Sequence, residues 1–388
     1  MTRSAPSVLR SQLAIAALFC FLGFQYGTWV SQVPALQGRL GLGKGELGLL
    51  LLAPGIGAAL SFPLVTALME RWGPRRLGST SAVVLLAVLA ALAAARTFPV
   101  ALLVLAVDGV AIACLNVAMN AQGARLEAEH RRAVMARLHA VFSAGLLCAA
   151  LLTSAVTAAG GSLPVHFAIG GAILVLLLAL SLTGARLEDV AAPVPGDRGR
   201  ERAAWQLPAA VTVLLTLAMA FAELTEGAMN DWSALYLKDV AGAPADLTPL
   251  GIAAFSGTML AVRFLVDTLR RRWGDRRVVL AGTTAAAAGL TGALLTSGLG
   301  PALSGFACVG AGMAAVTPCI YVAAARTGPA ALSLVASFGT IGLLAGPPVI
   351  GFVADRSGLA WGMAVVVAAM LLVAACVRLA TPATSVSG

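Results

Sequence analysis

Residues 207–237 read LPAAVTVLLTLAMAFAELTEGAMNDWSALYL, an apolar run that is interrupted by three carboxylates, Glu223, Glu226 and Asp231. The run is longer than the roughly 20 residues with which an α-helix crosses a hydrocarbon core about 30 Å thick. A charged side chain at the centre of such a helix costs about 2.5–3.5 kcal/mol on insertion scales, so it usually faces a cavity or a partner. The stretch therefore predicts a membrane-spanning helix whose acids have a function.

The composition of the whole chain is that of a polytopic membrane protein. Of its 388 residues, 59% are hydrophobic and 11% are charged, and the mean hydropathy is +0.92. The net charge of +9 does not predict nucleic-acid binding, because the arginines lie in short connections between apolar runs, where positive charge sets membrane orientation. The six cysteines lie singly inside apolar runs without a CxxC spacing, so we expect neither a disulfide framework nor a zinc site.

Apolar runs of similar length recur along the chain and predict twelve membrane-spanning helices. The first run is too long for the core of a signal peptide, so we expect it to be retained as a helix. The expected spans lie near residues 12–36, 46–70, 78–96, 98–125, 136–159, 163–185, 207–237, 247–270, 278–297, 300–325, 329–354 and 358–379. The expected fold class is an all-α polytopic membrane protein.

Arginine and lysine are unevenly distributed between alternate connections. About 20 of the 26 lie near the termini and in the even-numbered connections. The odd-numbered connections hold only Arg39, Lys44, Arg96, Lys238 and Arg356. Because cytoplasmic loops carry the excess of positive charge, this pattern predicts that both termini are cytoplasmic.

The chain repeats itself on either side of one long polar connection. Residues 71–76, RWGPRR, recur as residues 272–277, RWGDRR, each between the second and third spans of its half. Such duplication is typical of secondary transporters, in which two helix bundles rock about a site between them. We expect two pseudo-symmetric six-helix bundles, 1–185 and 207–388, joined by a flexible cytoplasmic linker at 186–206.

Residues 70–76, ERWGPRR, resemble the loop signature of the major facilitator superfamily, although Glu70 replaces the usual aspartate and Thr66 stands where a glycine often begins the signature. The resemblance covers nearly the whole chain and implies the twelve-helix fold of that superfamily. It also implies that charges of this loop and its counterpart form a cytoplasmic latch between helix ends, namely Glu70, Arg71, Arg75, Arg76, Asp267, Arg272 and Arg276. The alternative is that the arginines only orient the protein in the membrane.

Two further stretches, residues 226–237 and 116–123, look like an uncharacterised branch near the fucose-permease type of sugar and proton symporter. This resemblance implies a location in the bacterial cytoplasmic (inner) membrane and a proton gradient as the source of energy. It does not supply the coupling residues, because Asn116 stands in the place of the acid on the fourth helix and the first span contains no acid.

Helical geometry brings the acids of the seventh span together. At about 100° per residue, Glu223, Glu226 and Asn230 share a stripe about 60° wide, and Asp231 lies about 80° from Glu223. A carboxyl group near the midplane is desolvated, which disfavours its charged form, so it can exchange a proton as access alternates. We expect Glu223 and Glu226 to bind the coupling proton or the substrate.

Three other charged residues each have two interpretations. Arg263 either pairs with Asp267 on its own helix, or lies in the substrate cavity and forms an ion pair with Glu223 or Glu226 of the seventh span. Asp231 either joins the acid site or caps the outer end of the helix beside interfacial aromatic residues. Asp108, near the midplane of the fourth span, is either a displaced coupling acid or a buried hydrogen-bonded group.

Amides on two spans predict a cavity for a polar solute. We expect Gln25, Trp29 and Gln32 on one face of the first span, and Asn116 with Asn120 on one face of the fourth. Neutral donors and acceptors suit hydroxyl groups, and an aromatic ring covers the apolar face of a sugar. The alternative for each amide is a hydrogen bond between helices.

The eleventh span is rich in small residues and proline. These residues predict close helix packing and a kink, because a missing side chain admits a neighbouring backbone and proline removes a hydrogen bond. They are Gly339, Gly342, Gly346, Pro347, Pro348 and Gly351.

Together these features predict a secondary transporter that moves a small polar solute, such as a sugar, by proton-coupled alternating access. The alternative is a proton-coupled efflux antiporter for a drug or metabolite. We do not expect an enzyme, because His130, His139 and His166 are scattered and no nucleophile–base or metal-ligand spacing is present. We expect a monomer in the lipid bilayer with a small-molecule substrate, without cofactor or metal.

Overall fold

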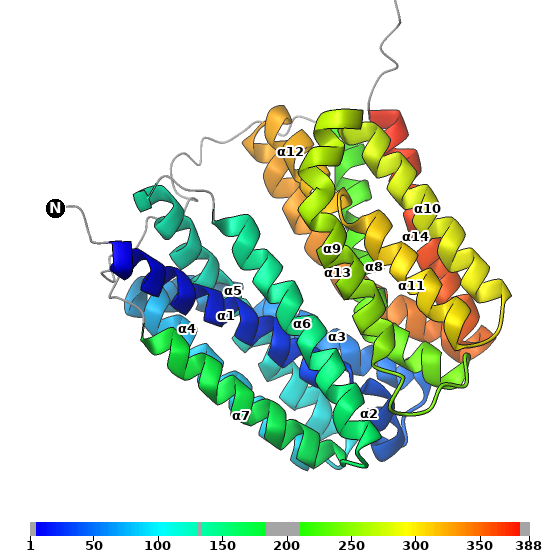
Figure 1. Cartoon of the computed structure of the whole chain (residues 1–388), viewed down its shortest axis with the longest axis horizontal. Coiled ribbons are helices and arrows are strands. Elements are labelled where there is room, and N and C mark those ends of the chain that lie inside the picture. Colours follow the sequence, from blue (N-terminus) through cyan, green and yellow to red (C-terminus); the bar gives the residue numbers. More distant parts are fainter. Residues whose placement is uncertain (1–4, 131–133, 184–209, 381–388) are drawn as a thin grey trace, which may run out of the picture. The chain divides into compact units, whose positions relative to one another are not determined.

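The computed structural model describes residues 5–130, 134–183 and 210–380, which are built from α-helices (Figure 1). This part of the chain contains fourteen helices and no strand. The linker predicted at 186–206 lies outside the described residues. The all-α class expected from the sequence is confirmed.

Contacts between helices divide the chain into two compact units, Met1–Leu42 with Leu50–Glu201 and Gly43–Leu49 with Arg202–Gly388. The first seven helices are α1 (Ala5–Val30), α2 (Val33–Leu40), α3 (Lys44–Leu60), α4 (Phe62–Ala94), α5 (Phe98–His130), α6 (Met135–Ala158) and α7 (Leu163–Leu182). The other seven are α8 (Ala210–Asp239), α9 (Leu250–Trp273), α10 (Asp275–Leu295), α11 (Leu299–Met313), α12 (Val316–Thr327), α13 (Pro329–Ser357) and α14 (Leu359–Ala380).

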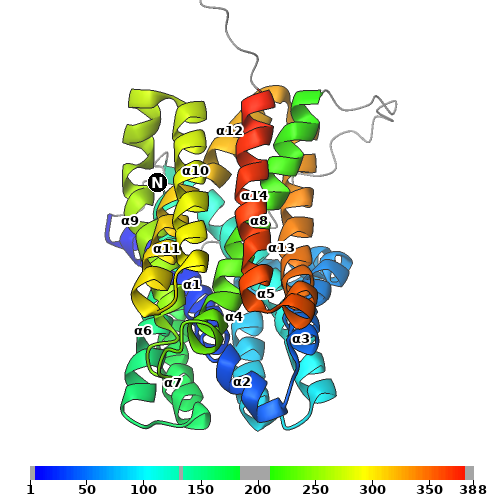
Figure 2. The same ribbon diagram turned by 90° about the vertical axis from the view of Figure 1, so that its right-hand side faces the viewer.

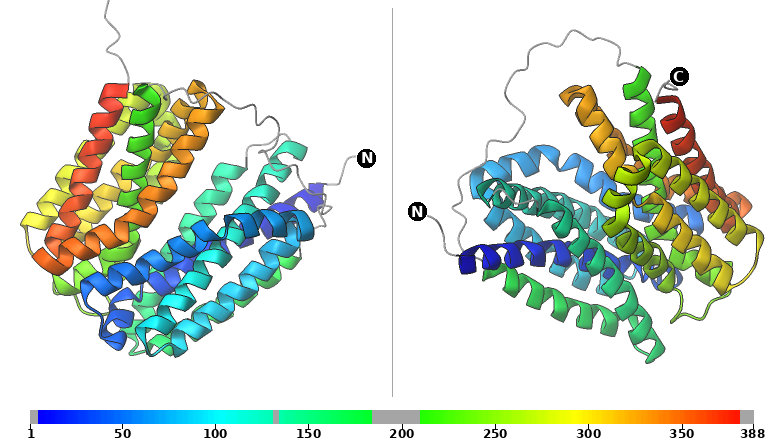
Figure 3. Two further views of the ribbon diagram at one scale, coloured as in Figure 1. Left: turned by 180° about the vertical axis from the view of Figure 1, so that it is seen from behind. Right: turned by 45° about the horizontal axis from the view of Figure 1, so that its top comes forward.

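Each unit has its own pattern of helix packing. In the first unit, α1 packs against α6 and α7, and α4 packs against α5. In the second unit, α14 runs beside α8 and α10 (Figure 2), and α13 lies next to α8 (Figure 3). The helix that carries the three acids, α8, therefore has neighbours along much of its length, and most of its residues from Thr212 to Leu237 are buried.

Ten described segments are long and apolar enough to cross a membrane, against the twelve spans expected. The expected span 46–70 is divided between α3 and the start of α4, and the next span continues α4 beyond Gly73. In α9 the apolar stretch is Leu250–Val266, and three arginines occupy the last turn of the helix. Leucines with side chains at least two-thirds exposed, such as Leu103 and Leu176, face outward as side chains in contact with lipid do.

The repeated motif adopts the same backbone conformation in both places. Gly73 has φ 74° and ψ 167°, and Gly274 has φ 79° and ψ 151°. This region is open almost only to glycine, because a Cβ would clash with the backbone. The helix direction therefore changes at Gly73 inside α4 and at Gly274 between α9 and α10, so the sequence repeat is also a structural repeat.

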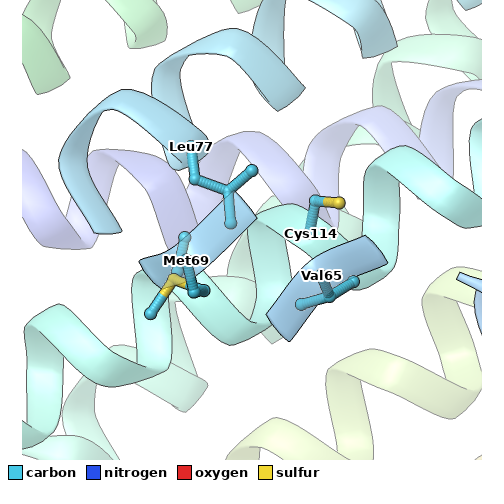
Figure 4. Packing of buried hydrophobic residues seen from close by; sticks show 5 residues of the cluster. Val65, Met69, Leu77 and Cys114 are labelled. Carbon is cyan, nitrogen blue, oxygen red and sulfur yellow. The ribbon is translucent and has the colours of Figure 1, made fainter. Parts of the chain in front are cut away.

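An apolar cluster holds the bend in α4 against α5 (Figure 4). Val65 and Met69 precede Gly73, Leu77 follows it, and Cys114 and Ala118 of α5 complete the cluster. Van der Waals packing of such side chains is what holds helices together in lipid, because lipid tails are as apolar as the side chains themselves. The cluster fixes the two arms of α4 on one face of α5.

Glycines of α13 bring its backbone against α8, as the sequence predicts. A methyl group on Gly342 would collide with the carbonyl oxygen of Ala220. A methyl group on Gly339 would lie 3.0 Å from Cγ of Met219 and 3.3 Å from Cγ of Glu223. The small residues of α13 thus make room for the turn of α8 that carries Glu223.

Candidate functional site

The acids of α8 lie beside an arginine of α9. Oε2 of Glu226 is 3.7 Å from Nη2 of Arg263, and the two side chains are 28% and 31% exposed. This distance is short enough for an ion pair, so Arg263 of α9 pairs with an acid of α8. The other interpretation, a pair with Asp267, involves a side chain outside the described part of the structure.

Glu223 lies one turn earlier on α8 and has a different partner. Thr317 of α12 donates a hydrogen bond from Oγ1 to Oε1 of Glu223 at 3.4 Å. The phenol of Tyr321, one turn further along α12, lies close enough to interact with the charge of Glu223. Arg263 and Glu226 also act on the Glu223 carboxyl group. The described site therefore combines residues of α8, α9 and α12.

The charge balance of this site determines what it can do. Two carboxyl groups lie near the guanidinium of Arg263: Glu226 forms an ion pair with it, and Glu223 lies one turn away on the same helix. One ionised carboxylate, one protonated carboxyl group and Arg263 together carry no net charge. With both acids ionised, the same three groups carry a net charge of −1, which a bound cation or a proton compensates.

Beyond Glu226, α8 is buried from Gly227 to Leu237. Asn230 and Asp231 are 8% and 6% exposed, and Oδ1 of Asn230 lacks a hydrogen-bond partner among the described residues. The two interpretations of Asp231 both stay predictions, and its aromatic neighbours Trp232 and Tyr236, which are 0% and 1% exposed, lie in the interior of the unit. The Tyr236 ring packs against Phe306 inside the unit.

In the first unit, α1 and α5 share a buried polar pair. Gln25 donates a hydrogen bond from Nε2 to Oδ1 of Asp108 at 2.8 Å, and both residues are 0% exposed. Trp29, on the same face of α1, is 1% exposed. The prediction that Gln32 continues this face is wrong, because α1 ends at Val30 and Gln32 occupies the N-cap position of α2, without a capping hydrogen bond from its side chain.

Asn116 and Asn120 share one face of α5, as predicted. Asn120 donates from Nδ2 to Oδ1 of Asn116 at 2.6 Å and to the Asn116 carbonyl oxygen at 2.8 Å. Asn116 is exposed and Asn120 is half-buried. Their bond lies along one helix, so it leaves the other hydrogen-bonding groups of the pair able to contact a solute.

The sequence pattern of the Major Facilitator Superfamily matches residues 13–332. The chain belongs to this superfamily. It is a multi-pass membrane transporter that moves a solute by secondary transport, and it is not an enzyme.

Relatives at the level of sequence agree with this membership. An uncharacterized transporter of Sinorhizobium fredii is 32% identical over 88% of the chain and 91% of the relative. An uncharacterized MFS-type transporter of Yersinia pestis is 30% identical over 96% of both. Membrane protein MosC of Rhizobium meliloti is 30% identical over 93% of the chain and 88% of the relative.

Solved structures of superfamily members share the fold at low sequence identity. The nucleoside transporter NupG superimposes with a TM-score of 0.76 at 13% identity, covering 96% of this chain and 99% of NupG. A bacterial homologue of the human lysosomal transporter Spinster gives a TM-score of 0.74 at 16% identity and covers 97% of both chains. Identity this low supports the shared fold alone.

The charged residues that the resemblance assigns to a cytoplasmic latch differ in their contacts and exposure in this structure. Arg270, which the sequence reading did not include, donates to Asp275 at 2.9 Å. Arg75 donates from Nη2 to the Leu182 carbonyl at 3.2 Å, and Arg276 to the Arg378 carbonyl at 3.3 Å. The other side chains of the predicted latch that the structure describes are exposed: Glu70, Arg71, Arg76 and Arg272. Whether these charges act as a latch stays a prediction.

Sequence reasoning missed Thr317 and Tyr321 as neighbours of Glu223. A lone threonine in an apolar span carries no pattern, since its hydroxyl usually bonds to its own helix. The structure ends α11 and begins α12 at Ala314 and Ala315, just before Thr317. Among the described residues, no three His, Cys, Asp or Glu side chains converge as a metal site requires.

Proposed function

We propose that the chain couples the movement of a small polar solute to protons, and that Glu223 and Glu226 carry the coupling proton. The observation that supports this proposal most is the arginine that lies near both acids. Glu226 pairs with Arg263, whereas the hydrogen bond that the structure records for Glu223 comes from the neutral hydroxyl of Thr317. A proton on the acid pair balances its charge, and its release restores a negative site.

Alternating access then links the proton to the solute. When the site faces the side of higher proton concentration, a proton neutralises the acid pair. The neutral site, with Arg263 paired to one carboxylate, is less costly to enclose in a low-dielectric environment than a charged one. After reorientation the proton leaves to the other side. Coupling requires that the enclosed state forms only with proton and solute bound, or with neither.

A polar solute is supported by the amides. On α5 Asn116 is exposed and Asn120 is half-buried, and on the helix of the acids buried Asn230 has a side-chain carbonyl oxygen without a hydrogen-bond partner among the described residues. Amide donors and acceptors match hydroxyl groups, as in a sugar. The resemblance to the fucose-permease type favours the same class. Efflux of a drug or metabolite by the same acids is the competing outcome, which the direction of proton flow distinguishes.

The proposal extends to the location and orientation of the protein. We place the protein in the bacterial cytoplasmic (inner) membrane, as a monomer of two bundles, 1–185 and 207–388, with both termini cytoplasmic. The positions of about 20 of the 26 basic residues support this orientation. In this proposal the proton gradient replaces any cofactor. A reporter that fluoresces only in the cytoplasm, fused to the C-terminus, is expected to be fluorescent; a dark fusion that is inserted in the membrane contradicts the orientation.

The test begins with the solute. Purified protein is screened by thermal shift against sugars, amino acids, nucleosides and cationic drugs, because a ligand that binds the folded state raises Tm. The best ligand is then used in proteoliposomes with an imposed pH gradient. Glu223→Gln and Glu226→Gln are each expected to abolish gradient-driven transport while solute exchange without a gradient continues.

The matched control is Glu46→Gln. Glu46 is an exposed acid at the start of α3 that accepts a hydrogen bond from the backbone N–H of Gly43 at 3.0 Å, and a glutamine oxygen can still accept that bond. This variant is expected to transport like the unaltered protein. Gradient-driven transport that persists in both α8 variants rules out the proposal. Accumulation when the inside is alkaline indicates symport, and when the inside is acidic, antiport.

A further inference from the structure

A second acid lies buried in the first unit, away from the Glu223 site. Asp108 of α5 is 0% exposed, as is its partner Gln25 of α1. Gln25 donates from Nε2 to Oδ1 of Asp108 at 2.8 Å. Two atoms of the pair, Oδ2 of Asp108 and Oε1 of Gln25, are buried without a hydrogen-bond partner in the described structure.

Both unpaired atoms are acceptors if Asp108 is ionised, so they cannot satisfy each other in that state. A proton on Oδ2 changes this relationship, because the carboxyl group then has an O–H donor. The carboxyl O–H can donate to Oε1 of Gln25 while the amide N–H donates to Oδ1. This reciprocal pair satisfies both atoms with one proton and no other group.

The neighbours of Asp108 supply no charge to hold an ionised carboxylate. The polar side chains near it are Gln25 and Trp29, and both are neutral; Nε1 of Trp29 is buried without a hydrogen-bond partner among the described residues. From α3, Pro54 presents its backbone to α5 at Gly109, beside Asp108. No arginine, lysine or second acid acts on Asp108 among the residues that the structure describes. An isolated ionised carboxylate in such a place is strongly unfavourable.

We infer that Asp108 holds a resident proton in a reciprocal acid–amide pair with Gln25, and that this pair joins α1 to α5. The proton stays with the pair during transport. Asp108 is therefore a positioning residue for the first unit and not a coupling acid. The pair gives α1 a fixed register on α5 in a region where lipid and apolar side chains offer no directional bond.

Infrared spectroscopy tests the proton directly. Purified protein in lipid is compared with Asp108→Asn, both in a Glu223→Gln, Glu226→Gln background that removes the other membrane acids of interest. The difference spectrum is expected to show loss of a protonated carboxyl C=O band. Its amplitude is expected to stay constant from mildly acidic to mildly alkaline pH. Loss of an ionised carboxylate signal instead overturns the inference.

Stability and transport give independent readouts. Asp108→Asn replaces the acid by an amide, and two amides can form the same reciprocal pair, so Tm is expected to change little. Gln25→Leu leaves a buried acid unpaired, and the drop in Tm is expected to be several times larger. Equal losses in both variants argue against a neutral pair.

In proteoliposomes, Asp108→Asn in the otherwise unaltered protein is expected to retain gradient-driven transport. If it loses gradient-driven transport while exchange continues, Asp108 is a coupling acid and the inference is wrong. The infrared and Tm measurements need no solute, so they remain decisive even if Glu223 and Glu226 do not couple protons.

Discussion

Glu226 and Arg263 join α8 to α9 through an ion pair whose closest atoms, Oε2 and Nη2, are 3.7 Å apart. Both side chains remain more than a quarter exposed. A pair this open contributes at most about 1 kcal/mol to stability, because solvent screens it. Stability therefore does not explain why two acids and an arginine lie on otherwise apolar helices of a membrane protein. A functional role is the better explanation, and it can be tested apart from folding.

Arg263→Gln is expected to leave Tm nearly unchanged and to lower gradient-driven transport at least about tenfold, the equivalent of about 1.4 kcal/mol. The reason is that Glu226 loses its compensating charge and the acid pair retains a proton too firmly. Transport in proteoliposomes and Tm are measured together. Arg271→Gln, at an exposed arginine later on α9 that contacts Thr268, is the matched control and should behave like the unaltered protein.

Thr317→Val is expected to reduce gradient-driven transport by a smaller factor. Its hydroxyl is 3.4 Å from Oε1 of Glu223, a long hydrogen bond, and such bonds contribute about 0.5–1.5 kcal/mol, or roughly 2- to 10-fold. Thr317→Ser keeps the hydroxyl and is expected to restore the rate. Equal rates in the valine and serine variants contradict a role for this bond.

Gly342→Ala is expected to destabilise the second unit by about 1–3 kcal/mol, because its methyl group collides with the carbonyl oxygen of Ala220 and the helices must separate. Gly292→Ala is the matched control inside α10, where a methyl group meets no atom within 4 Å. It is expected to be neutral or stabilising by up to about 1 kcal/mol. Thermal unfolding in detergent compares the two, and similar Tm values in both variants contradict the close packing of α8 and α13.

Gly274→Ala tests the backbone conformation of the repeated motif. A methyl group there has open space, so the expected cost of about 1–3 kcal/mol comes from φ 79° and ψ 151° alone. Gly38→Ala, in open space within helix α2, lacks this strain and is expected to be neutral or stabilising. Tm separates the two variants. No loss in Gly274→Ala means that the chain turns differently at this position.

Local sequence features predicted the helices well, and the repeated motif marked the two places where the structure bends, although no bend was predicted there. Long apolar runs define membrane helices because the bilayer fixes their length, and glycine at positions 73 and 274 marks a conformation that other residues avoid. The end of α1 was predicted less well. The residues on either side of the turn at Ser31 and Gln32, Val30 and Val33, are apolar and buried. The hydrophobic periodicity therefore did not reveal that α1 ends at Val30, and that Gln32 does not lie on the face of α1.

The positions of the site residues along α8 could be predicted from the sequence, whereas their partners on other helices could not. The angular positions of Glu223 and Glu226 follow from helix geometry. Arg263 had two expected partners, and the structure records the pair with Glu226. Thr317 lies 94 residues from Glu223 in the chain, and no local pattern links positions so distant. Trp232 and Tyr236 resemble interfacial aromatic residues in sequence, and only the packing of α10 and α11 shows that they are interior.

The backbones of α8 and α13 touch at Ala220 and Gly342, so a fluorescent label on α13 can report on the acid site. The neighbouring residue on α13, Ile341, is 52% exposed, so a fluorophore attached through Ile341→Cys sits outside the site yet on the helix that presses against it. Replacing Cys148 and Cys308, the exposed cysteines of the described chain, removes competing labels. Emission from this position can then follow events at Glu223 in real time without altering either acid.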